Sequence, residues 1–194
     1  DHSGHICLTD FGLSKDLGPE NKDAHTFCGT PEYLAPEIVM NMGHNKCVDW
    51  WSIGILLYEL TVGIPPYYSQ NLKDMYNKIQ FAPLLFPPHL SIQCKSLIML
   101  LLERDFKKRL GSTKEDVKEI MRQSFFRNID WDKLYNKKIK PHYKPNVKSN
   151  DDTSNFDKQF TNEPVVDSFV NGKSVSNDDA MFSNFGYIGD DLYQ

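Results

Sequence analysis

Cysteine and histidine, the common zinc ligands, are scarce and scattered in this chain. The 194 residues hold four cysteines, no two of which are separated by only two residues, and six histidines without ligand spacing. A zinc site is therefore not expected. The longest apolar run, residues 48–62, contains Asp49 and Glu59 and is too short and too charged to span a membrane, so no transmembrane segment is expected.

Positive charge is also in the minority. The net charge is −4, so the chain lacks the excess of positive charge that is typical of nucleic-acid-binding proteins. Neither a signal peptide nor a basic leader is visible, so we expect reduced thiols and a cytoplasmic location, with the nucleus as a second compartment. A chain of this length can bury one core, and we expect a monomer.

Helical patterns dominate the first two thirds of the chain. We expect a short strand over residues 5–9 and a loop over residues 13–34, where turn formers and hydroxyl residues gather. Residues 48–62 are apolar on every side, which predicts a helix inside a lobe with other helices packed about it. The other helices are predicted from Pro36 to near residues 42–43, over 71–80, after a Ser91 cap through residue 102, and from Thr113, with Asp116 as a loose capping box, to Arg122.

The composition changes after about residue 146, where asparagine, aspartate, serine and lysine replace most aliphatic residues. Such a segment would be disordered alone. Its scattered aromatic residues predict a tail that docks at points along a folded surface. They are Phe156, Phe160, Phe169, Phe182, Phe185 and Tyr187.

Several short motifs follow one another in a fixed order. Asp10-Phe11-Gly12 precedes Ala35-Pro36-Glu37, and Thr26-Phe27-Cys28-Gly29-Thr30-Pro31-Glu32-Tyr33 lies between them. Asp49-Trp50-Trp51 and Lys108-Arg109-Leu110-Gly111 come later. Together these motifs resemble the C-terminal half of an AGC-group serine/threonine protein kinase, in which the first two tripeptides bracket the activation segment.

Three further stretches resemble the branch that holds protein kinase B, the serum/glucocorticoid-regulated kinases and the ribosomal-protein kinases. They are residues 43–45, 128–131 and 160–168. The resemblance implies a mainly α fold: the large, C-terminal lobe of the protein kinase fold, entered just before the activation segment, with an extended AGC tail. It places a partial kinase domain at residues 1–126 and the tail at residues 127–194.

The resemblance implies ATP and Mg²⁺ as cofactors. Phosphoryl transfer needs magnesium held against the phosphates, and Asp10 matches the residue that binds this metal and, through it, the nucleotide. Thr26 matches the threonine that an upstream activating kinase phosphorylates, and Lys15 matches one cation that receives the phosphate. Thr30 matches the threonine that supports the catalytic aspartate.

The same resemblance assigns residues to substrate binding. Phe27, Pro31 and Leu34 match an apolar wall for the residue after the phosphoacceptor. Glu59 matches a carboxylate that binds an arginine upstream of the acceptor, which would favour basic protein substrates. The alternative for Glu59 is a solvated charge at a helix end.

Structural and tail residues complete the match. Glu37 and Arg109 are expected to form a buried ion pair, and Asp49 matches a carboxylate that accepts bonds from the catalytic loop. The tail offers Ser168 as a phosphorylation site and a hydrophobic motif of Phe182, Phe185 and Tyr187. Gly186 stands where the family carries a phosphorylatable or acidic residue, so we expect altered regulation there.

The 194 residues lack a glycine-rich loop, the lysine strand, its partner glutamate and the catalytic loop. We therefore expect a partial sequence that is inactive by itself, taken from a kinase that phosphorylates serine or threonine in basic protein substrates. The alternative is a non-catalytic binding fragment whose tail aromatics dock into the small lobe of a partner kinase.

Overall fold

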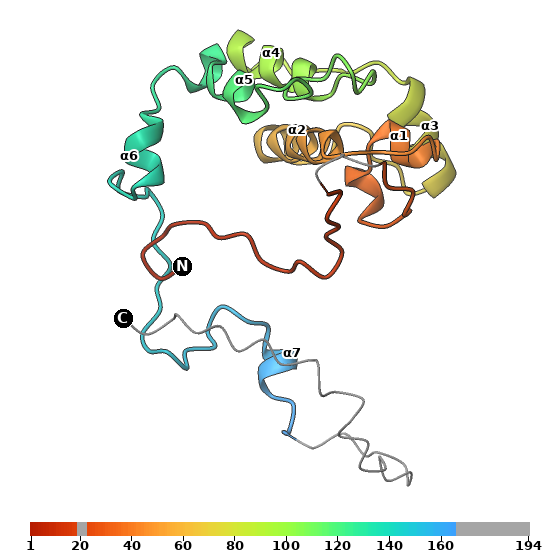
Figure 1. The fold of residues 1–194 in the computed structure, drawn as a ribbon. Coiled ribbons are helices and arrows are strands. Elements are labelled where there is room, and N and C mark those ends of the chain that lie inside the picture. Colours follow the sequence, from red (N-terminus) through yellow and green to blue (C-terminus); the bar gives the residue numbers. More distant parts are fainter. Residues whose placement is uncertain (19–22, 166–194) are drawn as a thin grey trace, which may run out of the picture. The chain divides into compact units, whose positions relative to one another are not determined.

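The computed structural model describes residues 1–18 and 23–165, and these residues are mainly helical (Figure 1). The chain divides into two compact units, Asp1–Pro145 and Asn146–Gln194. The second unit contains α7 (Lys158–Thr161). The first contains η1 (Pro31–Tyr33), α1 (Pro36–Val39), α2 (Cys47–Val62), α3 (Leu72–Phe81), α4 (Ile92–Leu101), α5 (Val117–Met121), η2 (Ser124–Phe126) and α6 (Trp131–Tyr135).

The strand predicted over residues 5–9 is wrong. These residues form no strand, and the side chains of Ile6 and Leu8 are 98% and 88% exposed. A strand requires a neighbouring strand for its backbone hydrogen bonds, and no strand forms anywhere in residues 1–18 or 23–165. The one β-type pairing among these residues is an antiparallel bridge between Ala24 and His44.

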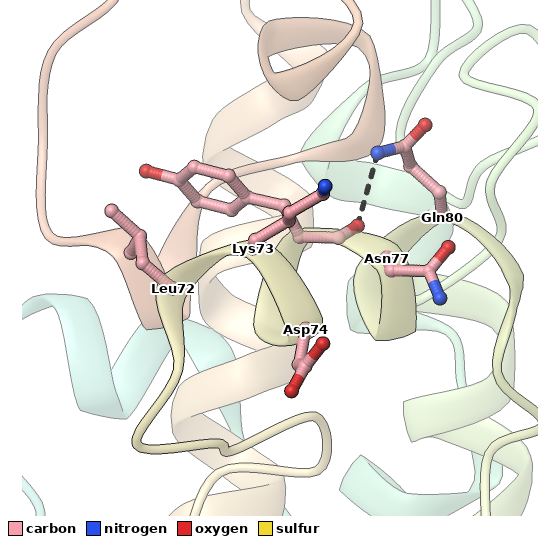
Figure 2. Close-up of a pocket in the computed structure, with 6 residues that line it drawn as sticks. Leu72, Lys73, Asp74, Asn77 and Gln80 are labelled. Atoms are coloured by element: carbon pink, nitrogen blue, oxygen red, sulfur yellow. Dashed lines mark hydrogen bonds between the residues drawn. The ribbon is translucent and has the colours of Figure 1, made fainter.

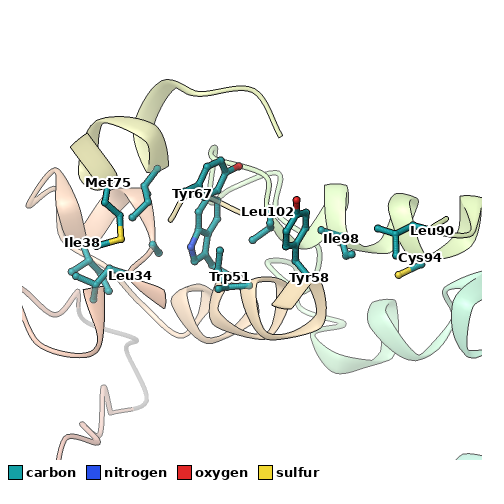
Figure 3. Packing of buried hydrophobic residues seen from close by; sticks show 13 residues of the cluster. Leu34, Ile38, Trp51, Tyr58, Tyr67, Met75, Leu90, Cys94, Ile98 and Leu102 are labelled. Atoms are coloured by element: carbon teal, nitrogen blue, oxygen red, sulfur yellow. The ribbon is translucent and has the colours of Figure 1, made fainter. Parts of the chain in front are cut away.

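Helix α2 forms the centre of the core, as its apolar sequence predicts. It packs against α4 and η1, and Trp51 and Ile55 are completely buried there, next to Tyr58, Ile98 and other core residues (Figure 3). Gly54 permits a close approach, because a Cβ atom at this position would lie 2.9 Å from the Cβ of Leu101 on α4.

The opposite face of α2 is not enclosed by other described residues, contrary to the prediction. Ile53, Leu56 and Leu60 are 43%, 45% and 75% exposed. They recur at a helical spacing, so they form one stripe that lies away from Trp51 and Ile55. The apolar sequence alone could not show which face of α2 receives neighbours within this part of the chain.

Two predicted helix starts are confirmed by side-chain caps. Asn71 Oδ1 accepts the backbone N–H of Asp74 at 3.1 Å at the start of α3. Ser91 Oγ accepts the backbone N–H of Cys94 at 3.2 Å at the start of α4. Each cap satisfies one of the backbone donors that a helix leaves free at its N-terminus.

Two other helix limits differ from the prediction. Helix α1 ends at Val39, because Asn41 adopts a left-handed conformation with φ of 52°. The capping box at Thr113 is absent. Asp116 has φ of 51° and its carboxylate instead accepts hydrogen bonds from Lys46 Nζ at 2.6 Å and Trp50 Nε1 at 3.1 Å.

The described part of the second unit, residues 146–165, contains one short helix. Asp157 caps α7 by accepting the backbone N–H of Gln159 at 2.9 Å. Phe156 and Phe160 are 67% and 65% exposed. The predictions for Phe169, Ser168, Phe182, Phe185, Gly186 and Tyr187 fall on residues 166–194, outside the described part of the chain.

Candidate functional site

Asp10 lies in a tight turn that leaves its carboxylate on the surface. The residue adopts φ of 61°, and its Oδ1 accepts the backbone N–H of Gly12 at 3.2 Å. Aspartate tolerates this left-handed conformation because its short side chain bonds locally. Ser14 closes the turn by donating its hydroxyl to the carbonyl of Phe11 at 2.6 Å. An exposed carboxylate on a fixed turn can bind a cation.

The backbone bridge between Ala24 and His44 positions the segment that carries Thr26. Two hydrogen bonds of 2.8 and 2.9 Å join these residues, and Ala24 is buried. Gly43 has φ of 82° beside the bridge, where a Cβ atom would lie 3.0 Å from the ring of His25. Burial lowers the pKa of His44. Thr26 itself is exposed two residues beyond the bridge.

Lys15 and Thr26 line two neighbouring hollows. One, of about 270 Å³, is lined by Lys15 and Ala24 among others, and the other, of about 330 Å³, by Thr26 and Thr30 among others. The two hollows share Leu13, His44, Val48 and Asp49. Thr26, the proposed site of phosphorylation, and Lys15, the proposed partner of the phosphate, therefore lie at adjoining hollows beside the start of α2.

Phe27 packs against Tyr76 of α3, a residue that no sequence motif marks. Its ring meets Tyr76 edge to face, with ring centroids 6.1 Å apart and an interplanar angle of 81°. Phe27 remains 54% exposed and Pro31 is partly exposed, whereas Leu34 is buried. Phe27 and Pro31 can therefore offer apolar surface to a ligand, while Leu34 mainly supports them from the core.

Glu59 is hydrogen-bonded within the fold. The hydroxyl of Tyr33 donates to Glu59 Oε2, and this hydrogen bond is the main reason why the pKa of Tyr33 is raised. Glu59 is partly buried near the end of α2, so it is more than the solvated helix-end charge considered as an alternative. Tyr33 and Glu59 are 26 positions apart in the sequence, so no local pattern predicts this contact.

Glu37 and Arg109 form the expected ion pair. Arg109 Nη1 and Nη2 donate to the two carboxylate oxygens of Glu37 at 2.6 and 2.8 Å, and the side chains are 0% and 3% exposed. Arg109 also donates to the carbonyls of Cys47 and Glu103, each at 2.9 Å. This two-pronged pair fixes the end of the segment that begins at Asp10.

Asp49 makes no side-chain hydrogen bond or ion pair with the residues that the structure describes. Loss of solvation raises the pKa of its carboxyl group, while His44 acts in the opposite direction. Asp49 and Thr30 line the same hollow. A carboxylate that loses solvation without gaining a partner is typical of a site where another group binds.

A hollow of about 680 Å³ lies over α3 (Figure 2). Polar and apolar side chains both line it, and the Gln80 side-chain amide donates to the carbonyl of Tyr76 at 3.0 Å. Because Tyr76 also contacts Phe27, this hollow adjoins the apolar wall. No sequence motif marks this hollow. The lining residues are Leu72, Lys73, Asp74, Tyr76, Asn77 and Gln80.

The residues present fit magnesium only as an ion shared with phosphate. No group of three histidine, cysteine, aspartate or glutamate side chains gathers in the part of the chain that was described. Magnesium, however, commonly uses one or two carboxylates together with substrate phosphates and water. Asp10 can supply one such carboxylate.

None of the helices in residues 1–18 and 23–165 combines the length and the apolar character that a membrane span requires.

Comparisons with known proteins agree with these observations. Residues 1–126 match the protein kinase domain, and residues 147–187 match the protein kinase C terminal domain. The boundary expected between residues 126 and 127 stays a prediction.

Curated relatives match almost the whole chain. Serine/threonine-protein kinase YPK2/YKR2 of Saccharomyces cerevisiae is 49% identical over 98% of this chain and 28% of its own length. Protein kinase 2 of Dictyostelium discoideum is 46% identical over 99% of this chain and 40% of its own length. The RAC family serine/threonine-protein kinase homolog of Dictyostelium discoideum is 51% identical over 84% of this chain and 36% of its own length.

The chain thus spans between 28% and 40% of the length of these relatives. Its helices correspond to the large lobe of the kinase fold, followed by the AGC tail. The chain belongs to the protein kinase family, within the AGC group of serine/threonine kinases.

Proposed function

We propose that this chain is the activation segment, large-lobe helices and tail of an enzyme that transfers the γ-phosphate of ATP to serine or threonine in protein substrates. One observation carries the proposal. The segment between Asp10 and Glu37 is anchored by the buried Arg109 pair, yet it presents Thr26 and Phe27 on the surface. A segment fixed at its end and open along its length can hold a peptide.

Each residue has one task in this proposal. Asp10 holds Mg²⁺, which supplies charge neutralisation at the phosphates when it is bound. Thr30 supports the catalytic aspartate, and Phe27 with Pro31 receives the residue after the acceptor. Glu59 binds an arginine upstream of the acceptor while Tyr33 fixes one of its oxygens.

The test is transfer of phosphate from magnesium-ATP to a serine peptide with upstream arginines. The full-length protein should phosphorylate this peptide, whereas residues 1–194 alone should not, because they contain neither a glycine-rich loop nor a catalytic loop. Failure of the full-length protein to phosphorylate any protein or peptide would refute the proposal.

Replacing Thr26 with Ala in the full-length protein should lower kcat/KM by about 100-fold, because a phosphate forms several charge-assisted hydrogen bonds that an alanine cannot form. Steady-state assays after treatment with the upstream kinase check this. Thr153→Ala, an exposed threonine of the tail, is the control and should leave the rate unchanged. An unchanged rate in Thr26→Ala would remove Thr26 as the switch.

Replacing Glu59 with Gln should lower kcat/KM for an arginine-containing peptide by about 10-fold to 100-fold, because the ionic part of a charged hydrogen bond is lost. The same peptide with alanine in place of the upstream arginine should react equally with both proteins. Glu115→Gln, an exposed acid bonded to Arg122, serves as the control. Equal losses with both peptides would contradict a role in arginine recognition.

The remaining proposals concern partners and location. We propose an upstream activating kinase, basic protein substrates, a monomeric state, and a cytoplasmic or nuclear location. Membership of the AGC group supports the upstream activating kinase, and the carboxylate of Glu59 supports basic substrates.

A further inference from the structure

Arg104 closes the C-terminal end of α3. Its Nε donates to the carbonyl of Ile79 at 2.8 Å, and its Nη2 donates to the carbonyls of Ala82 at 2.5 Å and Lys78 at 3.4 Å. The last carbonyls of a helix have no partner within the helix, and they carry partial negative charge. One guanidinium group therefore provides hydrogen-bond donors for three carbonyls at the end of α3. It comes from a residue 22 to 26 positions further along the chain.

The same guanidinium belongs to a stack of planar groups in the core. Its central carbon lies 5.4 Å from the centroid of the Tyr67 ring, and Tyr67 stacks on Trp51 at 6.1 Å with an interplanar angle of 12° (Figure 3). The guanidinium carbon of Arg109 lies 5.2 Å from the Trp51 ring. Arg109 in turn holds Glu37. The stack thus runs from the end of α3 to the end of the activation segment.

Ring faces, not hydrogen bonds, hold the two aromatic residues in this stack. Tyr67 and Trp51 are 3% and 0% exposed, and neither the Tyr67 hydroxyl nor the Trp51 indole N–H has a partner within the described residues. Cation–π contacts of this desolvated kind contribute more than exposed ones. Arg104 therefore helps to hold Tyr67, together with the stacked Trp51 ring and the surrounding core.

The Arg104 end of the stack is connected through α3 to Phe27, the proposed substrate contact. Helix α3 carries Tyr76, whose ring supports Phe27, and Arg104 fixes the turn of α3 that follows Tyr76. We propose that Arg104 is a positioning residue for substrate binding, which holds α3 so that Tyr76 keeps Phe27 in place beside the acceptor. This proposal rests on the proposed kinase function, because Phe27 is a substrate contact only in that setting.

Two substitutions in the full-length protein separate positioning from stability. Arg104→Met keeps much of the side-chain length but removes the donors, whereas Arg104→Lys keeps a charge and donors but not the planar face. Arg122→Met is the matched control, because within residues 1–18 and 23–165 this exposed arginine forms an ion pair with the exposed Glu115 alone, at 2.8 Å. Two arginine-containing peptides serve as substrates, with Phe or Gly after the acceptor serine.

Arg104→Met should raise KM for the Phe peptide about tenfold, the scale of losing part of an apolar pocket, and should leave KM for the Gly peptide and for ATP unchanged. Arg104→Lys should recover part of this loss. Amide hydrogen exchange of residues 79–82 should be faster in Arg104→Met and unchanged in the control. This measurement reports on the Arg104 hydrogen bonds at the end of α3 independently of activity.

Equal loss of kcat with both peptides, at unchanged KM, would reduce Arg104 to a stabilising residue and overturn the proposal. Unchanged exchange at residues 79–82 would also overturn it. If the wild-type protein phosphorylates both peptides and Arg104→Met discriminates between them as before, only this inference fails. If the wild-type protein phosphorylates neither, the proposed function fails and the inference fails with it.

Discussion

Arg109→Met should lower the free energy of unfolding by about 3–5 kcal/mol, because it leaves the carboxylate of Glu37 buried without its partner. Glu37 is only 3% exposed, so water cannot replace the guanidinium. The substitution also removes the donors to the carbonyls of Cys47 and Glu103. Urea unfolding of the wild-type and variant chains, followed by circular dichroism, measures the difference.

The control is Arg122→Met, which breaks an exposed pair and should cost about 1 kcal/mol or less. A double variant, Glu37→Leu with Arg109→Met, should be more stable than Arg109→Met alone, since no buried charge remains. A cost for Arg109→Met as small as that of the control would show that Glu37 finds another partner or becomes protonated without penalty.

Asp10→Asn should lower kcat of the full-length protein by about 100-fold to 1,000-fold, the usual cost of losing one electrostatic stabiliser of a transition state. The fold should be unaffected. Asparagine also tolerates φ near 61°, and its side-chain oxygen can still accept the Gly12 N–H. Steady-state assays at several magnesium concentrations check this, and the variant should require more magnesium than the wild type.

Asp16→Asn is a closely matched control. Asp16 Oδ1 accepts the backbone N–H of Gly18 at 2.8 Å, the same type of hydrogen bond that Asp10 makes with Gly12 within the same segment. Its substitution should leave kcat unchanged. Equal effects of the two variants would indicate that loop geometry, and not metal binding, explains the loss at Asp10.

Local signals explain what the sequence predicted well. Asn71 and Ser91 each cap a helix whose first turn follows directly, so the bond depends on residues three positions apart. The apolar run that became α2 exceeds the usual length of a strand, which left helix as the consistent choice. The Glu37 and Arg109 pair was expected from the family resemblance, not from spacing.

Long-range contacts explain what the sequence did not predict. Tyr33 reaches Glu59 across 26 residues, and Arg104 reaches Ile79 across 25, with no local pattern to mark either. Asp116 fitted a capping box, but tertiary contacts with Lys46 and Trp50 took its carboxylate. Propensity is a weak signal wherever a more distant partner competes for the same side chain.

Because the segment around Thr26 is held mainly by the bridge between Ala24 and His44, its conformation can change at a low cost in free energy. Among the described residues between 15 and 29, its two bonds are the backbone–backbone hydrogen bonds that reach beyond the segment. Two neutral hydrogen bonds contribute about 1–3 kcal/mol, which the charge-assisted bonds of one phosphate can exceed. The Glu37 end costs more to release. Phosphorylation of Thr26, as proposed above, would therefore rearrange the middle of the segment while its far end stays fixed, so regulation and folding would depend on separate contacts.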